Sequence, residues 1–271
     1  MCMTGMRSAL VVGATGLVGS NLVKLLCESE EYAAVNVISR RPLDYFHKKL
    51  VVTVREFDQI AEQDIEFAHE VYCCLGTTIK KAGSRPAFEK VDFEYPMTIA
   101  ALAKNRGIGH FIVISAMGAD EKALAYYSRV KGKLEKELIK MDFPQLSIVR
   151  PSLIIGDRQE FRLGETIGAK LLAVVNPLLV GRLKKARSIP ANQIALAMMV
   201  IALYGKKEKV SIYQSDELLE MQVPIMETVE LVTEEEVSFN WAKLKKDEFP
   251  PVDKEVIFDR SKIKTVDHEE K

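Results

Sequence analysis

Short runs of apolar and β-branched residues alternate with helix-like stretches over the first two-thirds of the chain. This alternation is typical of a parallel sheet that carries helices on both faces. Strands are predicted in the runs Ser8–Gly13, Val35–Arg40, Leu50–Phe57, Glu70–Gly76, His110–Ser115 and Gln145–Pro151. Helices are predicted in the runs Gly16–Ser29, Tyr95–Gly107, Ala123–Lys140 and Pro190–Gly205. The predicted fold class is therefore α/β, with a doubly wound parallel sheet.

The composition agrees with a folded globular chain and argues against a protein surface that binds nucleic acid or a membrane. Hydrophobic residues make up 48% of the 271 residues, and the formal net charge is +0. The longest apolar runs are shorter than the roughly 20 residues needed to cross a bilayer. The start MCMTGMRS carries neither a secretory nor a myristoylation signal, so cytoplasmic residence is expected by default. The cysteines show no metal-binding spacing and are interpreted as buried hydrophobes.

The composition changes near Gln222. Residues 1–221 are predicted to form one domain, and residues 222–271 an acidic C-terminal extension. This extension is either an arm that docks on the domain or on a neighbouring subunit of a homodimer, or a partly disordered tail. The sequence leaves these alternatives open.

A glycine-rich turn follows the first predicted strand and leads directly into a helix. Such a turn brings the backbone close to a pyrophosphate, and the free N–H groups of the helix N-terminus bind anions. The spacing is GxxGxxG rather than GxGxxG, and a turn needed only for packing is the alternative. A P-loop is disfavoured because Ser20 and Asn21, without a lysine, follow the last glycine. The sequence thus predicts a Rossmann-type dinucleotide site whose turn residues are Gly13, Thr15, Gly16, Leu17, Val18 and Gly19.

The end of the second strand indicates which dinucleotide is bound. An NAD site usually has an acidic residue there, whereas this chain has Arg40 and Arg41. Two guanidinium groups suit a 2′-phosphate, which predicts NADP(H); solvated arginines that merely open a loop are the alternative. Asp58 is expected near the adenine, and Gly76 and Thr77 where the cofactor passes close to the backbone.

Tyr127 and Lys131 lie four residues apart on one face of a predicted helix, among apolar positions. A lysine in a buried stripe requires a partner, and an ammonium beside a tyrosine hydroxyl lowers the pKa of that hydroxyl. The alternative is a lysine that snorkels to solvent from the edge of the stripe. Ser115 ends the fifth predicted strand, where open α/β sheets bind their ligands.

These residues resemble the short-chain dehydrogenase/reductase family, whose members combine a serine with a Tyr-x-x-x-Lys motif over a Rossmann cofactor. The resemblance implies carbonyl reduction or alcohol oxidation, with Tyr127 as general acid/base. It also implies that Lys131 binds the nicotinamide ribose and depresses the pKa of Tyr127, and that Ser115 binds the substrate carbonyl. The residues implied to flank the nicotinamide are Pro151, Ser152 and Leu153.

Within this family the chain is similar to atypical or extended members, and above all to the Tat-interacting-protein-like oxidoreductases. The landmarks are CCLGTT at Cys73–Thr78, VKGKLE at Val130–Glu135 and RPSLIIGDRQEFRLGE at Arg150–Glu165. Arg158 and Arg162 are the candidate contacts to a charged substrate. The region after the sixth strand is short, which leaves room for a small substrate lid or for an apolar patch that recruits a partner.

The sequence favours a cytoplasmic NADP(H)-dependent oxidoreductase that acts on a small carbonyl compound or alcohol. The rival hypothesis is an NADP(H)-binding regulatory protein whose cofactor state is read by a protein partner. An epimerase or dehydratase with the same triad is a third hypothesis. A metal site is not expected.

Overall fold

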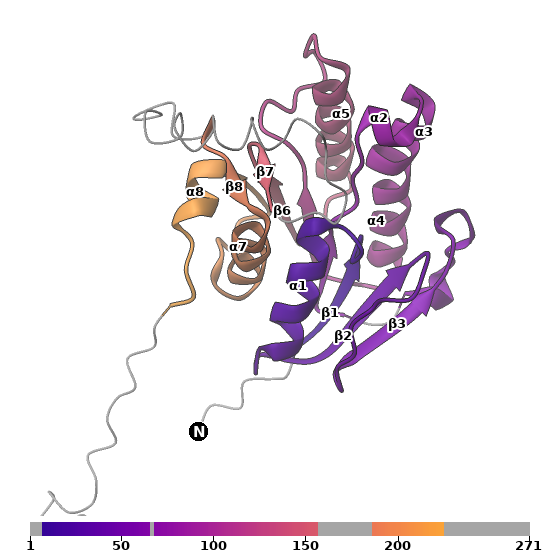
Figure 1. Ribbon diagram of the computed structural model, residues 1–271, viewed down its shortest axis with the longest axis vertical. Coiled ribbons are helices and arrows are strands. Elements are labelled where there is room, and N and C mark those ends of the chain that lie inside the picture. The colour runs from indigo at the N-terminus through magenta and orange to yellow at the C-terminus, as the bar shows by residue number, and fades with distance from the viewer. Residues whose placement is uncertain (1–6, 66–67, 157–185, 225–271) are drawn as a thin grey trace, which may run out of the picture. The chain divides into compact units, whose positions relative to one another are not determined.

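The computed structural model describes residues 7–65, 68–156 and 186–224, and all structural statements concern these residues (Figure 1). Their centre is a seven-stranded parallel sheet with the strand order β3-β2-β1-β4-β5-β6-β9. This order reverses direction beside β1, as in doubly wound nucleotide-binding sheets. The strands are β1 Arg7–Val12, β2 Tyr32–Ser39, β3 Leu50–Val54, β4 Glu70–Cys73, β5 His110–Ile114, β6 Gln145–Arg150 and β9 Val210–Gln214. The predicted α/β fold is confirmed.

Helices cover both faces of the sheet (Figure 1). On one face α1 packs against α7, and their apolar side chains form one core with alternate residues of the strands. On the other face α4 and α5 form a second core with the intervening strand residues. The helices are α1 Leu17–Glu28, α2 Ile79–Ala82, α3 Arg85–Glu89, α4 Tyr95–Asn105, α5 Tyr126–Lys140, α7 Ala191–Tyr204 and α8 Ser215–Glu220. Two short strands, β7 Ile154–Ile155 and β8 Ile189–Pro190, pair separately.

Several elements differ from the predicted pattern, among them the short helices α2 and α8 and the short strands β7 and β8, which were not predicted. The last strand of the sheet, β9, was not predicted, because its five residues stand between charged segments and resemble a surface loop. The helical segment before β5 begins earlier than predicted: α3 continues through a π-helical turn, Lys90–Glu94, into α4. Neighbouring residues of a strand point to opposite faces of the sheet, and accordingly Cys73 lies in one core and Cys74 packs against the other.

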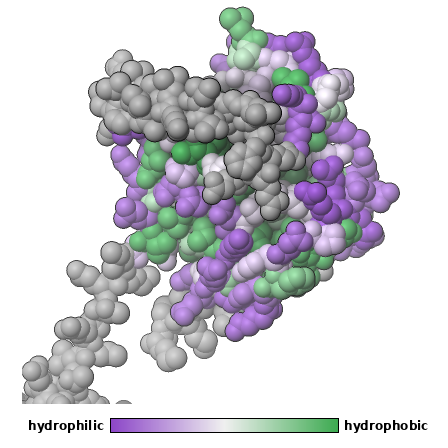
Figure 2. All heavy atoms as spheres, in the orientation of Figure 1, coloured by the Kyte–Doolittle hydropathy of each residue, from purple (hydrophilic) through white to green (hydrophobic). Residues whose placement is uncertain are grey.

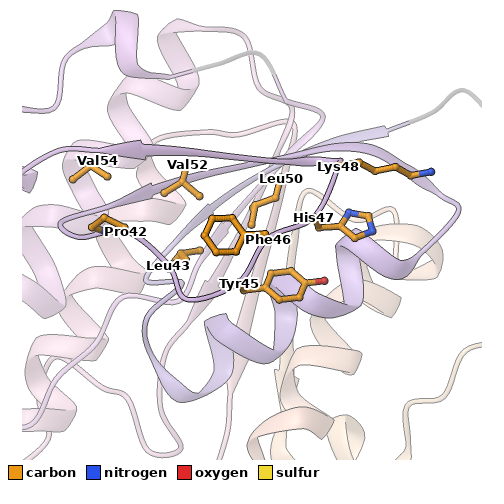
Figure 3. A pocket seen from close by; sticks show the side chains of 9 residues that line it. All are labelled: Pro42, Leu43, Tyr45, Phe46, His47, Lys48, Leu50, Val52 and Val54. Carbon is orange, nitrogen blue, oxygen red and sulfur yellow. The ribbon is translucent and has the colours of Figure 1, made fainter.

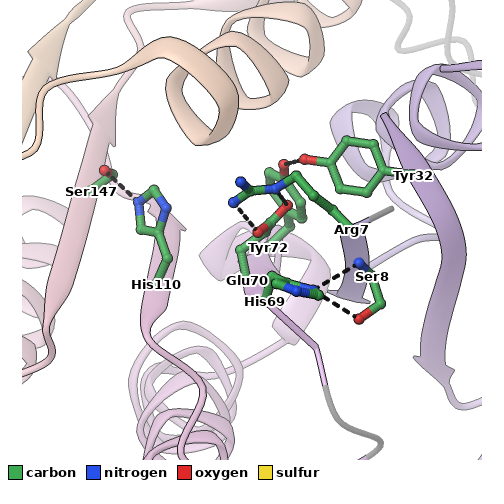
Figure 4. A network of polar contacts seen from close by, with 8 residues as sticks. All are labelled: Arg7, Ser8, Tyr32, His69, Glu70, Tyr72, His110 and Ser147. Carbon is green, nitrogen blue, oxygen red and sulfur yellow. Dashed lines mark hydrogen bonds and ion pairs between the residues drawn. The ribbon is translucent and has the colours of Figure 1, made fainter. Parts of the chain in front are cut away.

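A group of polar residues joins the amino ends of the strands, and we call it the amino-end cluster (Figure 4). Glu70 accepts hydrogen bonds from the Arg7 guanidinium at 2.7 and 3.2 Å. The hydroxyls of Tyr32 and Tyr72 lie 2.7 Å apart. His110 shares a hydrogen bond of 2.9 Å with Ser147. The members of the cluster are Arg7, Ser8, Tyr32, His69, Glu70, Tyr72, His110 and Ser147.

An apolar groove of about 530 Å³ lies on the α1 face beside β3, and we call it the β3 groove (Figure 3). It exists because the connection from β2 to β3 forms no helix that would cover this part of the sheet. Phe46, in that connection, is 91% exposed, and apolar side chains reach the surface over β3 (Figure 2). The groove is lined by Pro42, Leu43, Tyr45, Phe46, His47, Lys48, Leu50, Val52 and Val54, which include no residue of the glycine turn or of α5.

Candidate active site

The glycine turn fits tightly between β4 and the start of α1. Gly13 has a φ of +83°, and a Cβ at this position would lie 2.6 Å from the backbone carbon of Cys74. A Cβ on Gly19 would lie 2.3 Å from the carbonyl oxygen of Gly13. Both positions therefore require glycine, whatever the turn binds.

The N-terminus of α1 is open to an anion. Gly16 caps the helix without a side-chain hydrogen bond, and the first turn contains no acidic residue. The free N–H groups and the helix dipole favour a phosphate at this position. Thr15 is exposed beside it, Leu17 opens the helix half-buried, and Val18 is buried and can offer only its backbone. The turn therefore fits a dinucleotide pyrophosphate.

Arg40 and Arg41 are exposed and follow β2 at the same edge of the sheet as the glycine turn. The register places them there, because Val12 at the end of β1 pairs with Ile38 of β2. Asp58 is also exposed, but its carboxylate accepts a 2.8 Å hydrogen bond from Lys90. This hydrogen bond lowers the pKa of Asp58.

Lys131 is buried beneath the surface of α5, with only 2% of the residue exposed. Its ammonium lies 2.9 Å from Oδ1 of Asp92 and donates to the carbonyl oxygen of Ile114 at 3.3 Å. The other carboxylate oxygen of Asp92 accepts a 2.8 Å hydrogen bond from the backbone N–H of Thr77. Lys131 is thus an interior residue with a charged partner, and the snorkelling alternative is wrong.

Tyr127 stands one turn before Lys131, 38% exposed, with its ring 5.7 Å from the ring of Phe88. Burial around the hydroxyl raises the pKa of Tyr127; the Lys131 ammonium acts in the lowering direction and the Asp92 carboxylate in the raising direction. The depressed pKa expected for Tyr127 is therefore wrong, because burial of the phenol outweighs the lowering effect of the Lys131 ammonium. We call Thr77, Asp92, Tyr127 and Lys131 the carboxyl-end cluster. Gly76 adjoins it, since a Cβ there would lie 3.5 Å from Asp92 and 4.0 Å from Lys131.

Ser115 follows β5, but its hydroxyl is engaged within the protein. It is buried and donates its hydrogen bond to Glu135 of α5. Arg150, at the end of β6, donates from Nε to the same carboxylate at 3.0 Å. A hydroxyl has one proton to donate, so Ser115 can serve a substrate carbonyl only if that proton is redirected from Glu135.

The segment after β6 returns towards the glycine turn. Pro151 is buried and accepts a 2.9 Å hydrogen bond from the backbone N–H of Met117. Ser152 accepts a 2.9 Å hydrogen bond from the hydroxyl of Ser215, and Leu153 is exposed. Further along this segment, Gly156 lies against the side chain of Leu17 at the start of α1. The predicted substrate contacts Arg158 and Arg162, the apolar lid region and most of the 222–271 extension lie outside the described residues.

Asp92, Glu135 and Arg150 were not predicted as site residues. Asp92 stands in the polar stretch EKVDFEY and resembles a solvated charge. Glu135 offered a signal, because it lies four residues after Lys131 and therefore on the same buried face of α5. Arg150 meets Glu135 only through the tertiary fold.

The fold and the glycine turn define a dinucleotide-binding protein of the α/β class. A family described as NAD(P)H-binding matches residues 13–166, more than half of the chain. The chain belongs to this NAD(P)H-binding family.

Two named relatives agree with this assignment. Protein HTATIP2 of Rattus norvegicus is 36% identical over 169 residues, which cover 60% of this chain and 69% of the relative. Protein FMP52, mitochondrial, of Debaryomyces hansenii is 34% identical over 156 residues, or 56% of this chain and 69% of the relative. The resemblance to the Tat-interacting-protein-like oxidoreductases is thereby confirmed.

Solved structures share the fold at low sequence identity. MoeE5, in complex with UDP-glucose and NAD, superimposes with a TM-score of 0.59 at 14% identity, covering 78% of this chain and 79% of MoeE5. The likeness supports the extended Rossmann architecture.

The expectation of cytoplasmic residence is wrong. The FMP52 relatives of Debaryomyces hansenii, Eremothecium gossypii and Candida albicans are named as mitochondrial proteins. The expectation rested on the lack of secretory and lipid-anchor signals, and such a lack does not distinguish the cytoplasm from an organelle. Within the described residues, every helix is too short or too polar to cross a bilayer.

Proposed function

We propose that this chain is an NADP(H)-dependent oxidoreductase that reduces a small carbonyl compound or oxidises the alcohol, with Tyr127 as general acid/base. The observation that carries the proposal is a buried ammonium, Lys131, on the same helix face as the half-exposed Tyr127 and beside Gly76 at the carboxyl edge of the sheet. A positioned proton donor of this kind contributes roughly 10²–10⁴-fold to a reaction rate.

Each residue of the site has one task in this proposal. Tyr127 gives its hydroxyl proton to the substrate oxygen during reduction, and Lys131 stabilises the phenolate that remains and binds the cofactor ribose. NADPH, when bound, supplies the hydride. Because the pKa of Tyr127 is raised, its hydroxyl keeps the proton at neutral pH. A protonated Tyr127 can serve as the proton donor when a carbonyl compound is reduced.

The remaining contacts follow from the path of a dinucleotide over the carboxyl edge. The pyrophosphate would lie at the glycine turn and the N-terminus of α1. The adenine would lie near Asp58, and the nicotinamide beside Pro151, Ser152 and Leu153. Ser115 would bind the substrate oxygen after its proton turns from Glu135 to the substrate.

Tyr127→Phe tests the proposed chemistry, with Tyr126→Phe as the matched control. Both variants remove one hydroxyl from the first turn of α5, and Tyr126 points its hydroxyl to Glu89 instead. NADPH oxidation is followed by absorbance with a panel of aldehydes, ketones and quinones. We expect Tyr127→Phe to lose roughly 10²-fold or more of the activity and Tyr126→Phe to keep it. A Tyr127→Phe variant as active as the wild type would contradict the proposal.

The preference for NADP(H) rests on Arg40 and Arg41, whose exposed guanidiniums suit a 2′-phosphate. Fluorescence titration with NADPH and NADH compares the wild type with the Arg40→Ala/Arg41→Ala variant. The control is Lys48→Ala, which removes an exposed charge farther along the same connection. We expect only the arginine variant to lose the preference for NADPH. Tighter binding of NADH by the wild type would refute the assignment.

A second candidate function is NADP(H) binding without turnover, in which a protein partner reads the cofactor state. One observation favours it: Ser115 gives its only proton to Glu135. Full NADPH affinity without oxidation of NADPH by any compound of the panel would support this candidate over the enzyme.

A further inference from the structure

Asp92 and Lys131 form an ion pair in which neither partner reaches solvent. Asp92 is 1% exposed and Lys131 2% exposed, and Lys131 is the one buried lysine among the residues that the structure describes. Removing two charges from water is costly, and the attraction between them repays this only when the geometry and the further hydrogen bonds are good. A charged pair kept at this depth beside Tyr127 therefore calls for an explanation.

The carboxylate of Asp92 connects three elements. It stands in the π-helical turn between α3 and α4, and its two oxygens face different partners. One oxygen lies 2.9 Å from the ammonium of Lys131 in α5. The other accepts the 2.8 Å hydrogen bond from Thr77, in the loop after β4. Single π-helical turns inside helices are frequent at functional sites.

The charge balance around Lys131 depends on Asp92. The other titratable groups that face the ammonium are the phenol of Tyr127 and the thiol of Cys73 in β4. Burial raises the pKa of Cys73 to about 11, so this thiol is neutral at physiological pH. The ammonium of Lys131 also donates a hydrogen bond to the backbone carbonyl of Ile114, which carries no net charge. Among the described residues that face the ammonium, Asp92 therefore supplies the one full negative charge, and without it burial favours the neutral amine.

We propose that Asp92 is a positioning residue of this site: its carboxylate keeps Lys131 protonated beneath Tyr127 and holds the amide of Thr77, so that the loop after β4 and the first turns of α5 keep one fixed geometry. The proposal rests on the proposed function for its catalytic consequence. The part that concerns the charge on Lys131 can be measured without any substrate.

The test is Asp92→Asn, with Glu94→Gln as the matched control. Glu94 ends the same π-helical turn, and its side chain is exposed. Lysines are labelled with ¹³C at Cε, and the signal of Lys131 is identified by its loss in Lys131→Met. We expect this signal to remain that of an ammonium up to pH 9 in the wild type and in Glu94→Gln. In Asp92→Asn the acid dissociation constant of Lys131 should rise at least tenfold, which means that its pKa falls by one unit or more.

The functional arm measures NADPH affinity and turnover against pH. In Asp92→Asn both should fall as the pH rises through the new pKa of Lys131, whereas the wild type keeps them. A merely structural role for Asp92 would lower activity equally at every pH. A folded Asp92→Asn variant in which Lys131 stays charged up to pH 9 would overturn the proposal.

The role of Asp92 can be tested even if the wild type has no activity or if Asp92→Asn does not fold. If the wild type oxidises no NADPH, the proposed function fails, and the lysine titration still decides the role of Asp92. If Asp92→Asn does not fold, the double variant Asp92→Asn/Lys131→Met is used. We expect it to fold, because the unpaired ammonium has been removed. A double variant no more stable than the single one would also overturn the proposal.

Discussion

The amino-end cluster and the carboxyl-end cluster lie at opposite ends of the same sheet, and both contain buried charges. In the amino-end cluster Glu70 is fully buried, and its partner Arg7 is partly exposed. In the carboxyl-end cluster both charges are buried, and the half-exposed Tyr127 connects them to the surface. Parallel sheets of this type bind ligands at the carboxyl ends of their strands. Burial and shifted pKa values occur in both clusters, so position in the fold is what separates a candidate site from a structural network.

Among the substitutions in the amino-end cluster, Glu70→Gln is expected to have the largest effect at neutral pH. This change removes the charge that pairs with Arg7 at the start of β1. Breaking a buried ion pair costs about 3 kcal/mol of unfolding free energy, and the partial exposure of Arg7 places this case at the low end of the range. Urea denaturation gives the loss, and an NADPH titration should show unchanged affinity. If a folded Glu70→Gln variant bound NADPH more weakly, the amino-end cluster would not be a purely structural network, and the contrast with the carboxyl-end cluster would be wrong.

A second effect concerns acid stability. Burial lowers the pKa of His110 to about 3, and the positive charges of Arg7 and Lys207 act in the same direction. The unfolded chain binds this proton near pH 6.5, whereas the folded chain binds it only near pH 3. The contribution of His110 to the free energy of unfolding is therefore fully present above pH 6.5 and is lost as the pH falls from about 6.5 to 3. The slope expected from this one group is about 1.4 kcal/mol per pH unit.

His110→Asn tests this slope, because asparagine can keep a hydrogen bond to Ser147 without a titrating group. The stability that the variant loses between pH 7 and pH 4 should be smaller than the loss in the wild type, as measured by urea denaturation at each pH. If the variant and the wild type lost the same stability between pH 7 and pH 4, groups other than His110 would cause the acid sensitivity.

The smallest effect is expected from Tyr72→Phe. The change removes the 2.7 Å hydrogen bond between two buried tyrosine hydroxyls. Tyr32 keeps its interaction with Glu70, so no polar group is left without a partner. A neutral hydrogen bond of this kind contributes about 1 kcal/mol. Thermal denaturation would show the loss, and a loss as large as that of Glu70→Gln would mean that the cluster acts as one unit.

Local patterns in the sequence predicted the sheet and the glycine turn, because β1, the turn and α1 follow one another along the chain. The same patterns predicted that Lys131 is buried beside Tyr127. They could not predict the direction of the pKa shift of Tyr127, because this depends first on how deeply the fold buries the phenol and then on Asp92, which is distant in sequence. The contacts of Ser115 were missed for the same reason, since Ser115 meets Glu135, and Glu135 meets Arg150, only in the folded chain.

The position of β3, the strand beside the β3 groove, at the edge of the sheet has a consequence for self-association of the chain. Among the described residues β3 is an edge strand, and Val51 and Val54 are exposed on it. An open edge with exposed valines is a template on which a second chain can add a strand, and such edges lead to aggregation. Charged residues flank this strand: Lys48 and Lys49 precede it, and Arg55 and Glu56 follow it. Flanking charges of this kind act as gatekeepers, so the same short segment combines a hazard of self-association with the residues that oppose it.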